Sequence, residues 1–385
     1  MKSAIEAQSR RFVGTCGSAR RYYSGVQWRR PILALVPVVA ASVAIGAGRA
    51  QPPRNAEPPV APLVAAWTVT LPDQPAAAPA VDTEYAYVPL RNARLAALSL
   101  RDGATAWSVP LDDAVAPPAA GAGLVLVAHA TGVEALDARN GTRRWRAAID
   151  GTVSAPLFAE SGWLLVITDA GRATMMRAAT GERLWERALG SPSRIRPAAS
   201  GRRLYVGLDD GRVAALALET GRVVWEVKLP AAATTLHPLE DRVFVGASDR
   251  FFYCLSADKG KRKWRWRTGG AIAGSTTVDG DRVCFASLDN VLRALNRADG
   301  NQRWKAAVSH RPTGGPFLIG ELLFVAGVSS ELPAFRATDG RPAGTVKLGS
   351  EVPGTATLVP AAEGRPTRLL VISADGVAQL LESPR

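Results

Sequence analysis

The chain has 385 residues, of which 47% are hydrophobic and 21% are charged. This balance supports a sizeable buried core and argues against wholesale disorder. The formal net charge is +13, but residues 1–30 hold seven Lys/Arg against one acid, whereas residues 51–385 hold 39 basic and 33 acidic side chains. The body is therefore only mildly basic for its size, and we expect no nucleic-acid partner.

The first 50 residues have the features of an export leader. A basic stretch ending at Arg29 and Arg30 precedes residues 32–48, which are uncharged and mostly aliphatic, and Gly48-Arg49-Ala50 forms a small-x-small end. This pattern predicts a secretory signal peptide, although the run is also just long enough for an uncleaved membrane anchor. A Pro-rich linker follows at residues 51–61. We expect a periplasmic or otherwise extracytoplasmic body, anchored in the inner membrane if the leader is retained.

A repeat of about 40 residues runs through the rest of the chain. Tryptophans recur every 38 to 40 residues, at Trp67, Trp107, Trp145, Trp185, Trp225, Trp264 and Trp304. A glycine stands four residues before each of the last six, and one more continues the series, giving Gly103, Gly141, Gly181, Gly221, Gly260, Gly300 and Gly340. Such regular spacing indicates a repeat architecture. We interpret the tryptophans as rings packed between repeats, and the glycines as residues of the tight turns before them.

Each repeat has the composition of strands. Short apolar runs such as residues 124–127 and 163–168 are followed by turn pairs such as Asp210-Gly211. A second apolar run, the turn with the periodic glycine and the tryptophan segment come next, and Pro-containing segments such as residues 194–197 lead into a fourth strand. Four strands in about 40 residues predict one blade of a β-propeller.

The count of repeats predicts eight blades and the way the ring closes. The last unit ends near Leu380 without a tryptophan strand, whereas Trp67 belongs to a tryptophan strand with no unit before it. The sequence therefore predicts an all-β, eight-bladed propeller of four-stranded blades over residues 62–385, with residues 64–71 completing the last blade. Such closure leaves no unpaired sheet edge between the two ends of the chain. We expect the propeller to be monomeric.

No residue pattern indicates catalysis or a metal site. Cys254 and Cys284 lie in different repeats and are interpreted as buried apolar residues. The three histidines are far apart in sequence, with no neighbouring cysteines or paired carboxylates. The basic run at residues 259–267 alternates with Trp264 and Trp266, which is typical of an outer strand with its charges in solvent.

One set of polar residues is a candidate binding site. They lie in the segments that lead into the innermost strands, and we expect their side chains to point toward the axial channel. There they would hold an anionic ligand such as pyrroloquinoline quinone. The residues are Arg194, Arg196, His237, His310 and Arg311. The alternative interpretation is a solvated funnel lined by ordinary polar side chains.

Residues 135–145 resemble the tryptophan-docking repeat A-x-D-x-x-T-G-x-x-x-W of the pyrroloquinoline-quinone-type propellers. Residues 175–185 and 215–225 keep Thr-Gly-x-x-x-Trp but have Arg177 and Ala217 in place of the aspartate. The resemblance covers most of residues 62–385 and includes two groups: the periplasmic quinoprotein dehydrogenases, and the BamB-like proteins that serve as binding platforms in outer-membrane protein assembly.

The resemblance implies two alternative functions. The first is an exported, non-enzymatic scaffold for envelope proteins, with no cofactor. The second is an oxidoreductase that uses pyrroloquinoline quinone with Ca²⁺. A third alternative, a ligand-sensing propeller, rests on the arginines and histidines of the funnel and not on the resemblance. The dehydrogenases share adjacent cysteines and long insertions, which this sequence lacks, and a metal-binding carboxylate set, which no pattern in this sequence identifies. That difference favours the scaffold.

Overall fold

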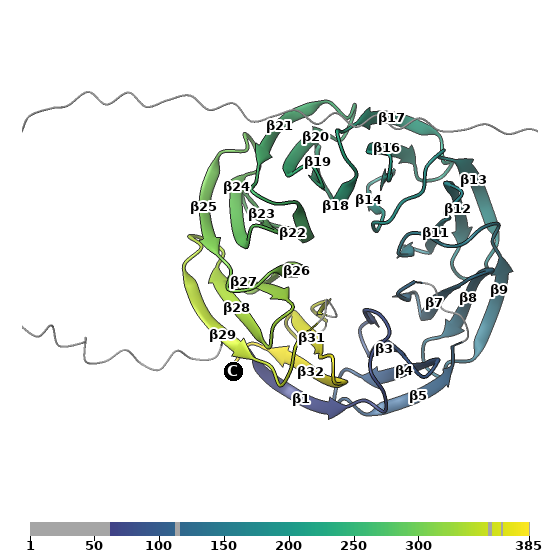
Figure 1. Cartoon of the computed structure of the whole chain (residues 1–385). Coiled ribbons are helices and arrows are strands. Elements are labelled where there is room, and N and C mark those ends of the chain that lie inside the picture. Colours follow the sequence, from purple (N-terminus) through teal and green to yellow (C-terminus); the bar gives the residue numbers. More distant parts are fainter. Residues whose placement is uncertain (1–61, 112–115, 353–355, 363–364, 385) are drawn as a thin grey trace, which may run out of the picture. The chain divides into compact units, whose positions relative to one another are not determined.

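The computed structural model describes residues 62–111, 116–352, 356–362 and 365–384. These residues form eight four-stranded antiparallel sheets arranged in a ring (Figure 1). The predicted all-β, eight-bladed propeller is confirmed. The predicted leader and linker, residues 1–50 and 51–61, lie outside the described residues. Within the described part, no helix is long and apolar enough to span a bilayer.

The blades are numbered 1 to 8 in chain order, with the blade that the N-terminal strand completes as blade 8, and they share one strand order from the axis outward. The inner strands are β2 (Ala80–Val81), β6 (Ala119–Gly121), β10 (Phe158–Glu160), β14 (Ala198–Ser200), β18 (Ala233–Leu239), β22 (Ile272–Asp279), β26 (Pro312–Ile319) and β30 (Thr357–Val359). The second strands are β3 (Tyr85–Leu90), β7 (Leu124–His129), β11 (Trp163–Ile167), β15 (Arg203–Gly207), β19 (Arg242–Ala247), β23 (Arg282–Ser287), β27 (Leu322–Gly327) and β31 (Arg368–Ile372).

The outer half of each blade carries the repeat signature. The third strands are β4 (Arg94–Ser99), β8 (Gly132–Asp137), β12 (Arg172–Arg177), β16 (Arg212–Ala217), β20 (Phe251–Ser256), β24 (Val291–Asn296), β28 (Glu331–Arg336) and β32 (Val377–Glu382). The outer strands are β5 (Thr105–Pro110), β9 (Arg143–Ala148), β13 (Arg183–Ala188), β17 (Val223–Lys228), β21 (Arg262–Arg267), β25 (Gln302–Ala307), β29 (Pro342–Lys347) and β1 (Val64–Thr70).

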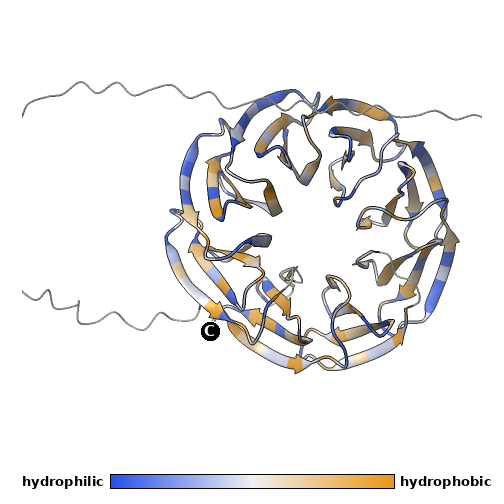
Figure 2. Ribbon diagram, in the orientation of Figure 1, coloured by the Kyte–Doolittle hydropathy of each residue, from blue (hydrophilic) through white to orange (hydrophobic). Residues whose placement is uncertain are grey.

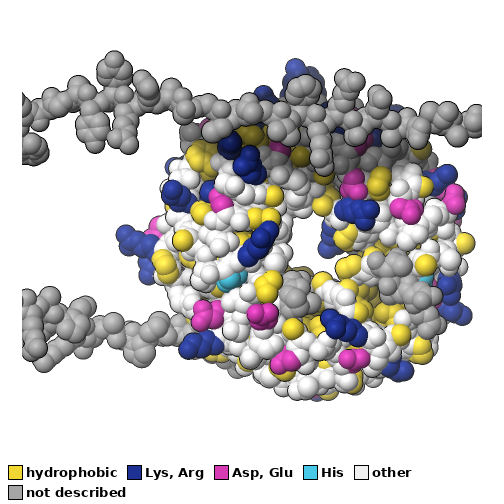
Figure 3. Space-filling model, in the orientation of Figure 1, with side chains coloured by type: hydrophobic (Ala, Val, Ile, Leu, Met, Phe, Trp, Pro, Cys, Tyr) yellow, Lys and Arg dark blue, Asp and Glu magenta, His cyan; other side chains and the backbone are white. Residues whose placement is uncertain are grey.

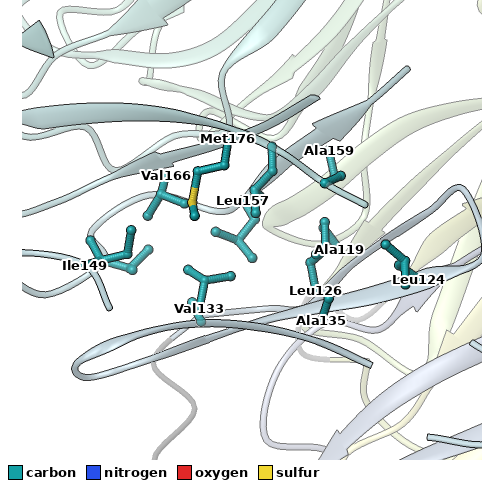
Figure 4. Close-up of a cluster of buried hydrophobic side chains, with 14 residues drawn as sticks. Ala119, Leu124, Leu126, Val133, Ala135, Ile149, Leu157, Ala159, Val166 and Met176 are labelled. Carbon is teal, nitrogen blue, oxygen red and sulfur yellow. The ribbon is translucent and has the colours of Figure 1, made fainter. Parts of the chain in front are cut away.

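The hydrophobic core lies between neighbouring blades. Leu126 and Val133 of blade 2 pack with Leu157, Val166 and Met176 of blade 3, and the side chains of both sheets interlock (Figure 4). Outer strands such as β9 and β21 carry hydrophilic residues toward solvent, whereas the strands inside them are mostly apolar (Figure 2). Burial of one face against each neighbour means that a single blade cannot be stable alone.

Each periodic tryptophan docks on the next blade. Its indole N–H donates to a backbone carbonyl 31 to 33 residues ahead, with N···O distances of 2.9 to 3.3 Å. Its ring covers the periodic glycine of that next blade, where an added Cβ would come within 2.4 to 2.8 Å of the indole. The glycine is thus required for close approach between blades as well as for its turn.

Blade 7 lacks this tryptophan because blade 8 lacks the turn on which it would dock. Each tryptophan docks on the turn that joins the third and outer strands of the following blade. In blade 8 these two strands are β32 and β1, which come from opposite ends of the chain. The corresponding position in blade 7 is Gly344, paired with Ala334.

The ring closes as predicted, through β1. Trp67 pairs with Leu380 in the β1–β32 ladder, and the Leu71 amide donates to the Gly376 carbonyl at 2.8 Å. The Trp67 indole then docks on Gly103 of blade 1. The two ends of the chain are therefore joined by the same contact that joins the other blades.

Candidate functional site

The wall of the axial channel contains a hollow of about 580 Å³ built from blades 3 to 6. The space-filling view shows the opening along the axis (Figure 3). Three of the five predicted binding residues line the hollow, namely Arg194, Arg196 and His237. Its polar lining also includes Glu160 at the end of β10, Thr234 and Thr235 in β18, and Ser275 in β22. The hollow thus joins side chains that are more than 110 residues apart in sequence.

Both arginines of the hollow face carboxylates. Arg194 Nε donates to Asp209 Oδ2 at 3.0 Å, and Arg196 Nη2 lies 3.9 Å from Glu160 Oε1. The four side chains remain partly in solvent, so these ion pairs are weak. The predicted positive funnel is therefore locally neutral, which favours a polar or mixed-charge partner over a strongly acidic cofactor.

Two further groups in the hollow can form hydrogen bonds. The Thr234 hydroxyl is buried and has no hydrogen-bond partner among the described residues. His237 is partly buried, and burial lowers the pKa of its imidazole below the usual value of 6.5. The ring is consequently neutral near pH 7, with one donor and one acceptor nitrogen.

The other two predicted residues lie elsewhere. His310 and Arg311 precede β26 in blade 7 and do not line the hollow. The His310 ring packs over Gly327, where an added Cβ would come within 2.1 Å of Cδ2. Burial also lowers the pKa of His310. Arg311 remains exposed. The sequence places all five residues in the segments that lead into inner strands. It does not show which of these segments line the same hollow.

A calcium-bound quinone would need a set of oxygen ligands around the metal. The described part of the chain contains no group of three or more His, Cys, Asp or Glu side chains placed to share a metal ion. Cys254 and Cys284 are fully buried, and neither forms a disulfide. Burial raises the pKa of both thiols, that of Cys284 to about 12. The thiols are thus neutral and packed in the core at physiological pH.

The basic run on β21 is a solvated outer strand. Lys263, Arg265 and Arg267 are exposed, whereas Trp264 and Trp266 are partly buried between them. Lys263 Nζ lies 2.5 Å from Asp241, and the Arg265 guanidinium lies 4.6 Å from the centroid of the Phe251 ring. Period-2 alternation explains this distribution without a nucleic-acid ligand.

Sequence reasoning missed Glu160, Thr234 and Ser275 because none belongs to a recognisable motif. A usable signal exists for Glu160 only, since it ends the inner strand of the blade before Arg196. Thr234 and Ser275 have no such signal. Their proximity depends on how the inner strands of blades 5 and 6 lie against each other.

Comparison with known families gives one match. A family model described as "Outer membrane protein assembly factor BamB" matches residues 65–194, 129–239 and 209–379. These overlapping segments cover the propeller from β1 to β32. No curated protein matches the chain in a sequence search.

Comparison with solved structures shows the same fold in proteins of different function. BamB from Moraxella catarrhalis has a TM-score of 0.70 at 18% identity, covering 83% of this chain and 99% of that one. A quinohemoprotein alcohol dehydrogenase from Pseudomonas putida has a TM-score of 0.69 at 14% identity, covering 84% and 76%. The computationally designed Ika8 protein has a TM-score of 0.72 at 12% identity, covering 83% and 99%. At these identities the likeness supports the fold alone.

Proposed function

The chain belongs to the family of outer membrane protein assembly factor BamB, and on that premise we propose that it is an exported, non-enzymatic propeller that binds protein partners in the cell envelope. The hollow in the channel wall is its candidate docking point. The proposal includes a monomeric propeller without a cofactor, located outside the cytoplasm.

One observation carries the proposal: the hollow offers hydrogen-bonding groups and exchangeable ion pairs. Arg194 and Arg196 are held by solvent-exposed carboxylates, which a partner's acidic groups can replace at small cost. The buried Thr234 hydroxyl has no hydrogen-bond partner among the described residues and can bond a group that enters the hollow. Such a polar, preformed recess suits recognition of a peptide segment.

Site-specific crosslinking in cells tests this function. A photo-crosslinking amino acid at position 196 should capture envelope protein partners. The same amino acid at position 202, an exposed turn residue outside the hollow, should capture far less. The charge reversals Arg194→Glu and Arg196→Glu together should reduce capture by a crosslinker placed at position 275. Equal capture at positions 196 and 202, or no effect of the charge reversals, contradicts the proposed docking point.

The competing function, a quinone-dependent oxidoreductase, has a direct test. Pyrroloquinoline quinone is titrated calorimetrically into the full-length protein, with and without Ca²⁺. We expect no saturable heat, because the described residues offer no carboxylate set for the metal. Calcium-dependent binding that is lost in Arg196→Ala or His237→Ala contradicts the non-enzymatic assignment and would justify an assay of dehydrogenase activity.

A further inference from the structure

The junction between blades 8 and 1 contains a second cavity, of about 510 Å³, remote in sequence from the channel hollow. Three arginines line it: Arg101 in blade 1, and Arg365 and Arg368 in blade 8. Glu382 at the end of β32 is the only carboxylate among the described residues that line it. Arg101 Nη2 also lies 3.6 Å from Asp102 Oδ2, outside the cavity lining, so the excess of positive charge comes from Arg365 and Arg368.

Arg368 is the buried member of this group. It is 4% exposed, and its Nη1 donates to the Leu100 carbonyl of blade 1 at 3.1 Å. Nε and Nη2 are buried and have no hydrogen-bond partner in the described residues. These two nitrogens form the edge of a guanidinium that binds a carboxylate through two parallel hydrogen bonds. An unpaired buried edge of this kind is costly for the folded protein.

Two of the three equivalent arginines of other blades have carboxylate partners, whereas the third, Arg203, donates to the Ala257 carbonyl. Arg242 and Arg282, like Arg368, are the first residues of their second strands. Arg242 lies 3.4 Å from Asp241, and Arg282 lies 2.6 Å from Asp279. Arg368 forms no ion pair within the described residues. Burial, followed by the neighbouring charge of Arg365, lowers the pKa of its guanidinium. Among the described residues, blade 8 thus holds the arginine without a paired carboxylate, unlike blades 5 and 6.

The origin of the cavity lies in the closure of the ring. In the other seven blades a turn joins the third strand to the outer strand, and a tryptophan of the preceding blade covers that turn. In blade 8 these strands are β32 and β1, so no turn joins them. Ala66 of β1 and Ser383 after β32 instead border the cavity.

We propose that this cavity, the seam site (Arg101, Arg365, Arg368 and Glu382), binds a small polycarboxylate. One carboxylate pairs with the Nε–Nη2 edge of Arg368, and others pair with the exposed Arg101 and Arg365. The volume is that of a small-molecule site. Nε and Nη2 are shielded from solvent in this structure. A side chain at the rim of the cavity must therefore move before a carboxylate can reach them. The site is independent of the channel hollow and of the proposed partner.

Calorimetric titration of the full-length protein with citrate, at constant ionic strength, tests the seam site. We expect saturable binding. The double variant Arg101→Gln/Arg365→Gln should weaken citrate binding at least tenfold, while keeping the fold because both side chains are exposed. Arg202→Gln, which changes an equally exposed arginine outside the site, should change the affinity less than twofold. Arg368→Lys keeps the charge but loses the paired edge, and should also weaken binding.

Further arms of the titration define the ligand. A blocked peptide rich in aspartate and glutamate should bind more weakly than citrate, since the proposal is a free small molecule. Tighter binding of that peptide, or of inorganic phosphate, overturns this ligand assignment. Absence of citrate binding, or equal affinity in the double variant, overturns the site itself.

Glu363 lies two residues before Arg365 in sequence. Citrate binding that appears only in Glu363→Gln would mean that the chain supplies its own anion, which also overturns the proposal.

Discussion

The indole ring of Trp185 in blade 3 lies directly on Gly221 of blade 4. A Cβ added to Gly221 would come within 2.5 Å of Trp185 Cε3, and the indole N–H donates to the Leu218 carbonyl at 2.9 Å. The same pair recurs at the other six junctions that contain a tryptophan. The stability of the ring therefore depends on contacts whose contributions can be measured one at a time.

Substitution of Gly221 by alanine should destabilise the propeller more than the same substitution at Gly201. Both glycines have positive φ, +64° for Gly221 and +58° for Gly201. Alanine is strained in this backbone conformation by about 1 kcal/mol, and this cost is common to the two variants. Gly201 has nothing within 4 Å of an added Cβ. Gly221→Ala should lose about 1–3 kcal/mol more through overpacking against the indole. Chemical denaturation measures both variants, and equal losses would contradict the role of close approach.

Replacement of Trp185 by phenylalanine isolates the hydrogen bond to the next blade. The Leu218 carbonyl loses its indole donor, and we expect the free energy of unfolding to fall by about 1–3 kcal/mol. Trp266→Phe is the matched control, because Trp266 is a partly buried outer-strand indole outside the series of interblade bonds. Similar losses in the two variants would show that ring area alone matters.

Removal of β1 should open the ring. A chain that begins at residue 72 lacks Trp67, the β1–β32 ladder and the contact with Gly103. We expect a loss of more than about 3 kcal/mol relative to a chain that begins at residue 56, since loss of one buried tryptophan alone has that effect. Thermal unfolding compares the two chains. A synthetic peptide of residues 60–75 should restore part of the loss, and no difference between the chains would contradict closure by β1.

Acidification should weaken the fold through His237 and His310. Burial holds the pKa of both below 6.5 in the folded state, so the unfolded chain binds protons more readily. Stability is therefore fully present above about pH 6.5 and declines as the pH falls below it. Denaturant titrations at pH 7 and pH 5 should show a smaller difference for His237→Asn/His310→Asn than for the unmodified protein. An unchanged difference would assign the pH dependence to other groups.

The two core thiols should resist chemical modification. Cys254 and Cys284 are buried, and burial raises the pKa of each, so the reactive thiolate is scarce and inaccessible. With the third cysteine of the sequence, Cys16, replaced by serine, a thiol reagent at pH 8 should label them only as fast as the protein unfolds. Labelling should become rapid in denaturant. Rapid labelling of the native protein would contradict their burial.

The sequence allowed prediction of the blades because their residues repeat. Trp185, Gly221 and their counterparts recur at a fixed period, and that period implies one supersecondary unit per 40 residues. The absence of tryptophan at Gly344 was visible in the sequence, but its reason was not. It follows from β32 and β1 being joined by no turn. The candidate sites were predicted only in part. The segments that lead into inner strands carry polar residues whether or not these residues line a common hollow.

By itself, the sequence determined the blade count, the closing strand and the burial of the tryptophans, because these follow from local patterns repeated along the chain. Only the tertiary structure decided that Arg196 faces Glu160, that His310 lies apart from His237, and that Arg368 lacks an anion among the described residues. These relationships join residues of different blades, and they depend on how each blade is placed against its neighbours. No spacing within a single repeat encodes that placement.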